Sequence, residues 1–217
     1  MSHVVLLGDS IFDNAAYVRG GPAVIDQVAG LLPDGWRATL KAVDGSVIDD
    51  VHRQLERLPG DASHLILSAG GNDILGELGV LGARVGTVGE GLRRLADIRE
   101  RFDRDYDRLI RAIRGRGLPS AVCTIYNPWF PDPGLQREAV TALCLFDDVI
   151  IRAAQRSRLP ILDLRALCTT EADFATPIEP STIGGDKIAH AIVDLVLHHD
   201  FARGQSVLWG GHMMSEG

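Results

Sequence analysis

The sequence predicts a single α/β domain in which helices cover both faces of a parallel β-sheet. Short runs of apolar and β-branched residues alternate with longer segments whose apolar residues recur at helical spacing. The short runs are apolar throughout, which is typical of parallel strands buried on both faces. The 217 residues are 46% hydrophobic and 24% charged, which is ordinary globular composition and enough for one well-covered core.

Five strands are predicted, and turn-forming residues such as glycine and aspartate bound them. These runs are too apolar for a half-exposed hairpin, so the sheet is expected to be parallel and central. The predicted strands are His3–Leu7, Trp36–Val43, Leu65–Ala69, Ala121–Tyr126 and Ile161–Leu164.

Five helices are predicted between and after these strands, with Pro22 and Ser181 as helix-start residues. The predicted helices are Ala23–Leu32, Val47–Leu58, Glu90–Arg116, Leu135–Arg158 and Ser181–Phe201. The glycine-rich stretch Gly76–Gly91 is expected to be a mobile loop beside the active face. We place the domain at residues 1–203 and a C-terminal tail at residues 204–217, either loose, folded back or reaching a neighbouring subunit.

Composition excludes several classes of function. A net charge of −7 and a pI near 5.4 argue against a nucleic-acid surface, which needs an excess of clustered Lys and Arg. No apolar run is long enough to span a membrane and no secretion signal is visible, so the expected location is the cytoplasm. Cys123, Cys144 and Cys168 are widely spaced and odd in number, which suggests neither a disulfide framework nor a zinc site. The expected partner is a small-molecule substrate, and the sequence leaves open whether the chain forms a homo-oligomer.

Three polar segments follow three predicted strands. The carboxyl ends of parallel strands meet at one edge of the sheet, where ligand sites form beside helix N-termini. The segments are Gly8-Asp9-Ser10, Asp44-Gly45-Ser46 and Gly70-Gly71-Asn72-Asp73. Each is also an ordinary turn sequence on its own, but their shared position at strand ends favours a common site.

Ser10 is the candidate nucleophile of that site. A tight turn after a buried strand exposes its hydroxyl and directs backbone amides towards an incoming carbonyl oxygen. The backbone N–H groups of Ser10 and Gly45, with the side-chain NH₂ of Asn72, would form a three-donor oxyanion hole. The sequence therefore predicts acyl transfer through a serine, and this chemistry requires no cofactor.

These segments, in this order, resemble those of the SGNH hydrolases, also called the GDSL type. Residues 8–14 are similar to the first family block, Gly45 to the second and residues 70–73 to the third. Pro180-Ser181, Gly184-Gly185 and Lys187-Ile188-Ala189 resemble the start of the last helix, so the similarity covers nearly the whole chain. It implies a flavodoxin-like three-layer α/β/α sandwich, a serine nucleophile, and activity on esters, thioesters or acetylated sugars.

In the region of the last family block, this sequence departs from the family pattern. The family normally has an Asp and a His three residues apart, the His directly before a proline, and here Thr176 and Glu179 occupy these places. Glu179 itself can be the base, although a free Glu has a pKa near 4.3, roughly two units below His, unless burial raises it. Alternatively, His212 in the tail swings in or comes from a second subunit. A third explanation is that catalysis is weakened or lost, which leaves a ligand- or carbohydrate-binding module.

Other polar and aromatic clusters admit two interpretations each. Aspartates near the strand ends can bind magnesium, but capping of free backbone amides is their commoner use and is preferred here; they are Asp9, Asp13, Asp44, Asp49, Asp50 and Asp73. The segment Tyr126–Pro131 can line the pocket or pack a loop onto the body. No segment resembles a lid for long lipids, so a short, acetyl-like acyl group is expected. The resulting prediction is an esterase with Ser10, Gly45, Asn72 and Glu179 in the site, and without metal.

Overall fold

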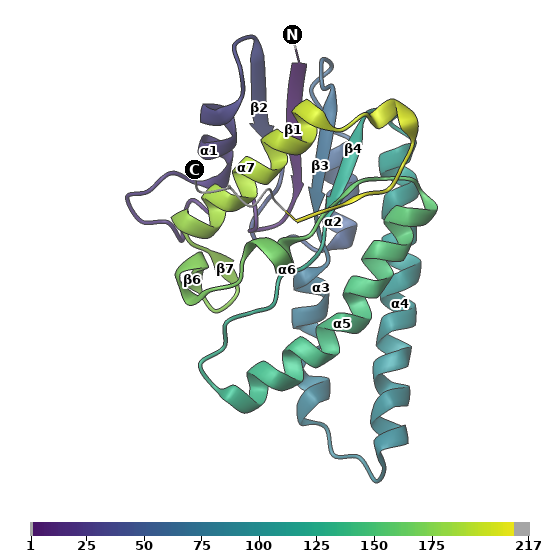
Figure 1. Cartoon of the computed structure of the whole chain (residues 1–217). Coiled ribbons are helices and arrows are strands. Elements are labelled where there is room, and N and C mark those ends of the chain that lie inside the picture. Colours follow the sequence, from purple (N-terminus) through teal and green to yellow (C-terminus); the bar gives the residue numbers. More distant parts are fainter. Residues whose placement is uncertain (1, 211–217) are drawn as a thin grey trace.

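A six-stranded parallel sheet lies at the centre of the computed structural model, which describes residues 2–210 (Figure 1). Its strand order is β2-β1-β3-β4-β5-β8, so successive strands are added on one side of β1 and then on the other, as in doubly wound folds. The strands are β1 Ser2–Gly8, β2 Trp36–Leu40, β3 His64–Ser68, β4 Ser120–Cys123, β5 Ile161–Leu162 and β8 Leu208–Trp209. Val4 of β1 lies between Ala38 of β2 and His64 of β3, which fixes the register at the centre of the sheet.

Alternate residues of the strands pack against different helices. Val4 and Leu6 join the core under α1 (Val24–Leu31) and α7 (Thr182–His198). Val5 and Leu7 face the opposite core, formed with α2 (Ile48–Leu55), α4 (Val88–Arg114) and α5 (Pro133–Arg156). All four strand side chains are fully buried. The uniformly apolar strand sequences are therefore explained by burial on both faces.

Side-chain caps set the first residues of the longer helices. Thr87 Oγ1 accepts the Glu90 amide at the start of α4, and Asp132 Oδ1 accepts the Leu135 amide at the start of α5. Ser181 Oγ accepts the Ile183 and Gly184 amides at the start of α7, as the sequence predicted. Pro22 was predicted as a helix-start residue, but it precedes the N-cap of α1, Ala23.

The short elements between these helices position the site. They are α3 Gly71–Gly76, α6 Leu164–Leu167, the antiparallel pair β6 Phe174–Thr176 and β7 Glu179–Pro180, and the 3₁₀ turns η1 Leu78–Gly82, η2 Glu171–Asp173 and η3 Phe201–Arg203.

Two predictions about the fold were wrong in part. The sheet has six strands instead of five, because Leu208 and Trp209, in the segment expected to be a tail, pair with Ile161 and Leu162. The stretch Gly76–Gly91 is not all loop: η1 occupies its first half, and α4 begins inside it at Val88. Only residues 83–87 connect the two.

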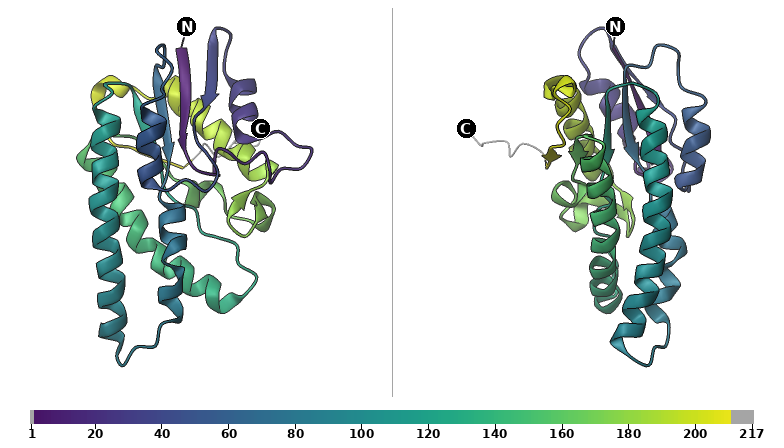
Figure 2. Two further views of the ribbon diagram at one scale, coloured as in Figure 1. Left: turned by 180° about the vertical axis from the view of Figure 1, so that it is seen from behind. Right: turned by 90° about the vertical axis from the view of Figure 1, so that its right-hand side faces the viewer.

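The helices extend beyond the carboxyl edge of the sheet. Figures 1 and 2 show α3 and η1, together with the first part of α4 and of α5, projecting past the strand ends. We call this part the helical extension and define it as residues 71–98 and 133–146. Within residues 2–210, no helix is both long and apolar enough to cross a membrane.

Candidate active site

The turn after β1 is held by two close contacts. Gly8 has φ 126°, and a Cβ at this position would lie 1.6 Å from the Ser68 carbonyl oxygen of β3, so only glycine fits. Buried Gln54 of α2 accepts the Gly8 amide at 2.8 Å and donates to the Gly8 carbonyl at 2.8 Å. Asp9 Oδ1 then accepts the Ile11 amide at 3.2 Å. The backbone just before Ser10 is therefore held between Ser68 of β3 and Gln54 of α2.

Ser10 and Glu179 meet at this turn. Ser10 Oγ donates a hydrogen bond to Glu179 Oε1 at 3.0 Å, and each residue is only 6% exposed. The residues on either side of Glu179 are held as well: Asn14 Nδ2 donates to the Pro180 carbonyl at 3.2 Å, and the Tyr126 hydroxyl donates to the Ile178 carbonyl at 2.7 Å. Two residues 169 positions apart are thus placed within proton-transfer distance.

Burial changes the acidity of Glu179. Desolvation raises the pKa of its carboxyl to about 7, the hydrogen bond from Ser10 opposes this rise, and the charge of Asp44 adds to it. Glu179 Oε2 is buried and has no hydrogen-bond partner within residues 2–210, so the charge is poorly compensated. A carboxylate with this pKa is about as basic as an ordinary histidine, whose pKa is near 6.5.

The second and third loops are joined beside Ser10. Asn72 Nδ2 donates to the Ser46 carbonyl at 2.9 Å, and Asp73 Oδ2 accepts the Ile48 amide at 3.1 Å. An amide NH₂ has two hydrogens, so the bond to Ser46 leaves Asn72 one further donor. Gly45 precedes Ser46, is exposed and has φ 76°, a conformation that suits glycine. The structure thus brings the loops of Gly45 and Asn72 together, whereas their roles as oxyanion donors stay predictions.

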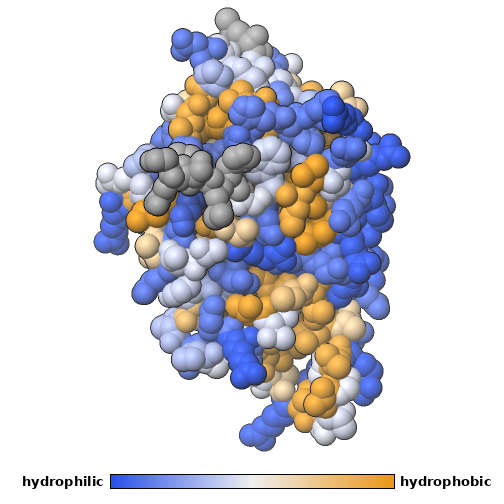
Figure 3. All heavy atoms as spheres, viewed as in Figure 1, coloured by the Kyte–Doolittle hydropathy of each residue, from blue (hydrophilic) through white to orange (hydrophobic). Residues whose placement is uncertain are grey.

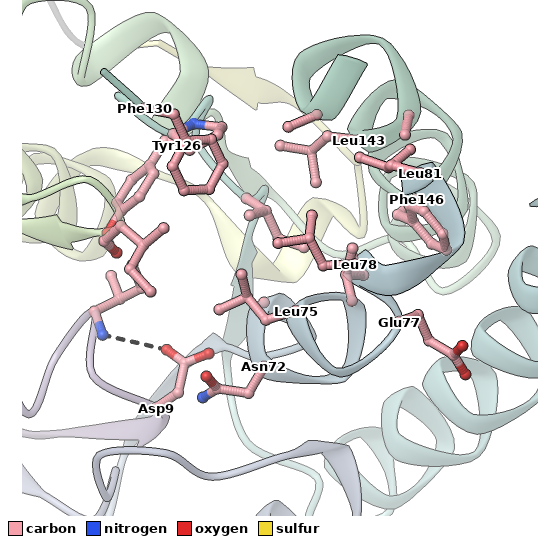
Figure 4. Close-up of a pocket in the computed structure, with 18 of the residues that line it drawn as sticks. Asp9, Asn72, Leu75, Glu77, Leu78, Leu81, Tyr126, Phe130, Leu143 and Phe146 are labelled. Atoms are coloured by element: carbon pink, nitrogen blue, oxygen red, sulfur yellow. Dashed lines mark hydrogen bonds between the residues drawn. The ribbon is translucent and has the colours of Figure 1, made fainter. Parts of the chain in front are cut away.

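Asp9 is a titratable residue whose importance the sequence did not reveal. It is 4% exposed, and burial raises its pKa to about 7, with smaller contributions from the charges of Glu179 and Asp73. Its side chain lies beside Asn72 at one end of the pocket (Figure 4). Its place directly before the candidate nucleophile was the available signal, but the sequence suggested only a turn residue or a metal ligand there.

Ser10, Asn72 and Glu179 line one pocket together with many apolar side chains (Figure 4). Its empty space amounts to about 960 Å³ when the open mouth is counted. The apolar lining consists of Ile11, Ile74, Leu75, Leu78, Val80, Leu81, Leu95, Ile98, Ile125, Tyr126, Pro128, Phe130, Ala139, Ala142, Leu143, Phe146 and Ile178. The predicted site residues 10, 72 and 179 therefore share a cavity that reaches into the helical extension.

The aromatic segment after β4 serves both predicted purposes. Tyr126 and Phe130 line the pocket, whereas Trp129 stacks on Phe174 of β6 at 6.1 Å and its amide donates to the Pro177 carbonyl. The segment thereby walls the cavity and fixes the loop that precedes Glu179.

The described histidines lie away from the pocket. None is among its lining residues within positions 2–210. His3 is buried and bonds Asp61 and Thr39 from the opposite end of β1, and His190 and His198 are exposed on α7. His212 lies outside the described residues.

Four of the six aspartates near the strand ends accept backbone amides, whereas Asp44 accepts the Tyr17 hydroxyl and Asp49 pairs with Arg108. Asp13 accepts the Asp44 amide, and Asp50 accepts the Val47 amide, in the same way as Asp9 and Asp73 do. In the described part of the chain, no group of three or more His, Cys, Asp or Glu side chains is placed to hold a metal ion. Cys123 and Cys168 are buried and Cys144 is exposed, and all three are free.

A buried serine–carboxylate pair lies at the carboxyl edge of a doubly wound sheet, which is where α/β enzymes place their active sites. The comparison with known families agrees. The model of the GDSL-like lipase/acylhydrolase family matches residues 6–184, and the chain belongs to this family. It is therefore an enzyme that acts on ester bonds.

Solved structures share the fold at low sequence identity. An extracellular lipase from Streptomyces rimosus is 15% identical with a TM-score of 0.64, over 91% of this chain and 99% of that one. A phospholipase A1 from Streptomyces albidoflavus NA297 is 14% identical with a TM-score of 0.66, over 90% and 98%. An acetyl xylan esterase from Geobacillus stearothermophilus is 18% identical with a TM-score of 0.60, over 88% and 93%. No curated protein matches in sequence.

Proposed function

We propose that this protein is a serine esterase in which Ser10 is the nucleophile and Glu179 the general base. The observation that carries the proposal is the 3.0 Å hydrogen bond from Ser10 Oγ to a buried carboxylate whose pKa is about 7. At neutral pH about half of such carboxylates are ionised and able to accept the serine proton. Glu179 thus takes the place that histidine has in most of the family.

The reaction proceeds through an acyl-enzyme. Ser10 Oγ attacks the ester carbonyl while its proton passes to Glu179 Oε1. Collapse of the tetrahedral intermediate breaks the ester C–O bond, and Glu179 returns the proton to the departing alkoxide. Water then attacks the acyl-serine, again losing a proton to Glu179, and the acid is released while the proton returns to Ser10 Oγ.

The negative oxygen of the intermediate needs donors on the other side of Ser10. The backbone N–H groups of Ser10 and Gly45, with the second hydrogen of Asn72 Nδ2, are the proposed donors. Asn72 is held by the Ser46 carbonyl next to Gly45, which supports a shared role for the two loops. Removing one such donor typically costs about 10²- to 10³-fold in kcat.

The test is hydrolysis of p-nitrophenyl esters by the wild type, Ser10→Ala and Glu179→Gln. We expect Ser10→Ala to abolish hydrolysis above the buffer rate, and Glu179→Gln, which keeps the shape of the side chain, to lower kcat by about 10²- to 10⁴-fold. Glu171→Gln on exposed η2 is the matched control and should leave kcat unchanged. A fluorophosphonate probe should label the wild type at Ser10. Full activity of Ser10→Ala would contradict the proposal.

Two alternatives have distinct outcomes in the same experiment. If a histidine of the tail is the base, His212→Ala loses activity and Glu179→Gln retains it. His212→Ala is a better probe than deletion of residues 204–217, because that deletion removes strand β8. A binding module without catalysis, which the sequence left open, is disfavoured by the family match. In that case all variants, and the wild type, would match the buffer blank.

A further inference from the structure

The pocket beside Ser10 continues far beyond the space that an acetyl group needs. Its polar lining residues come from the ends of β1 and β3, the start of α3 and β7; they are Asp9, Ser10, Ser68, Asn72 and Glu179. The rest of the lining is almost wholly apolar. Apart from Ile11 and Ile178 beside the catalytic pair, it comes from the segment of α3 and η1, from α4, α5 and the loop after β4.

The single charged residue among these helical lining residues does not make the cavity polar. Glu77 accepts a hydrogen bond from Arg101 Nη2 at 2.9 Å, and Figure 4 shows its carboxylate directed away from the other labelled side chains. The cavity is therefore polar at the catalytic end and apolar in the helical extension.

The apolar side chains of α3 and η1 are only partly buried. No residue of either element is fully buried, although Ile74, Leu75, Leu78 and Leu81 are large and apolar. Leu75, Leu78 and Leu81 line the same cavity as Leu143 and Phe146 of α5 (Figure 4). A concave pocket with a mostly apolar lining and a few convergent polar groups is typical of a ligand site. Figure 3 shows the same apolar character over the lower part of the molecule, where the helical extension lies.

The length of the cavity follows from the elements that line it. Asn72, beside the nucleophile, and Leu81, in the extension, are nine residues apart on two successive helical segments. At 1.5 Å per residue or slightly more, they lie about 14 Å apart along the segments. An acetyl group fills only the catalytic end of such a cavity.

We propose, as an extension of the esterase function above, that the helical extension binds the acyl chain of a medium-length fatty ester, of about octanoyl size. The linear apolar cavity matches an unbranched hydrocarbon chain in shape and polarity, whereas a sugar would leave hydroxyl groups without partners there. The exposed Gly45 loop, where Tyr17 bonds Asp44 at 2.8 Å, is left for the alcohol part of the ester. This proposal replaces the acetyl-like group expected from the sequence.

The first experiment measures kcat/KM for p-nitrophenyl acetate, butyrate, hexanoate and octanoate. Each buried CH₂ is worth about 0.8 kcal/mol at most, or about fourfold, so we expect a rise of about two- to fourfold per added CH₂ up to octanoate. A parallel series of acetates with lengthening alkyl alcohols should show no such rise. A rise with alcohol length instead of acyl length would overturn the assignment of the cavity.

The second experiment fills the cavity. Ala142→Phe on α5 places a ring among the lining residues, and Ala96→Phe on the exposed face of α4, which does not line the cavity, is the matched control. We expect Ala142→Phe to lower kcat/KM for octanoate by at least about tenfold and to leave acetate within about twofold, whereas Ala96→Phe changes neither. Leu78→Trp is a second filling variant on the facing element, for use if Ala142→Phe does not fold.

Failure of this proposal differs from failure of the esterase function. Absence of hydrolysis that depends on Ser10, for every ester, would contradict the function itself. Hydrolysis of acetate that depends on Ser10, without a gain on longer acyl chains and without an effect of Ala142→Phe, would contradict only the acyl cavity.

Discussion

Under the proposed function, glutamate at position 179 removes the serine proton in the place of the usual histidine. An exposed Glu is too weak a base near neutrality, because its pKa is near 4.3. Here burial supplies the missing basicity by raising the pKa to about 7. The cost is a carboxylate that must be charged in a poorly solvated place, with Oε2 lacking a partner in the described chain.

The pH profile of activity should show this substitution directly. Only ionised Glu179 accepts a proton, so log kcat/KM should rise with pH and level off above a midpoint near 7. The measurement is kcat/KM for one p-nitrophenyl ester between pH 5 and pH 9, extrapolated to zero buffer. Activity that stays level down to pH 5 would show that the base has the pKa of an ordinary glutamate and that burial does not set it.

At the scale of elements, α2 acts as a clamp on the end of β1. Gln54 is the only polar residue of α2 that is fully buried, and it satisfies both backbone groups of Gly8, two residues before the nucleophile. Its Nε2 also donates to Ser46 Oγ at 3.3 Å. A single side chain thus connects the first and second loops of the site.

Gln54→Leu should therefore affect stability and activity together. It leaves the buried Gly8 amide unpaired, whereas the Gly8 carbonyl keeps the Val43 amide at 3.1 Å. One unpaired buried group costs about 1–3 kcal/mol, so we expect the free energy of unfolding to fall by about 2 kcal/mol. Urea unfolding at pH 7 measures this change. Arg53→Leu, on the exposed side of the same helix, is the control and should stay within about 0.5 kcal/mol of the wild type. Equal effects of the two substitutions would show that the clamp contributes nothing.

Local patterns allowed most of this architecture to be predicted. The five apolar runs became β1 to β5 because burial on both faces requires apolar residues throughout. Strand β8 could not be predicted, since two residues in a tail give no periodic signal and their pairing with β5 depends on where the chain returns. The glycines of residues 76–91 suggested a loop, but residues 78–82 form a 3₁₀ turn whose Leu78 and Leu81 line the cavity.

The candidate site, too, could be predicted from the sequence only in part. Ser10, Asn72 and Glu179 were predicted because each follows a turn or motif that sequence order reveals, and the structure brings them to one cavity. The depth of that cavity was not predicted, because it depends on how α3, η1, α4 and α5 pack together in space. The raised pKa of Asp9 was not predicted either, since burial of a carboxyl is a property of the folded chain.

At the scale of the whole molecule, the buried carboxyls make stability depend on pH. Burial raises the pKa of Asp9, Asp147 and Glu179 to about 7 in the folded chain, against 3.8 for Asp and 4.5 for Glu outside it. Between about pH 4 and pH 7 the folded chain consequently binds more protons than the unfolded chain, so the free energy of unfolding falls as pH rises. His64 and His199 act in the opposite direction, because burial lowers their pKa and favours the folded state above about pH 6.5.

Glu179→Gln isolates one of these carboxyl groups. The amide cannot ionise, so the variant should lose less stability than the wild type between pH 5 and pH 8, with a difference on the order of 2 kcal/mol. Urea unfolding of both proteins at the two pH values gives this difference, and the histidine contributions cancel in the comparison. Glu171→Gln on exposed η2 should follow the wild type at both pH values. If the difference in free energy of unfolding between Glu179→Gln and the wild type is the same at pH 5 and pH 8, Glu179 has the same pKa in the folded and unfolded chain. In that case the base would owe its strength to substrate binding, and the pH profile of kcat would shift from that of kcat/KM.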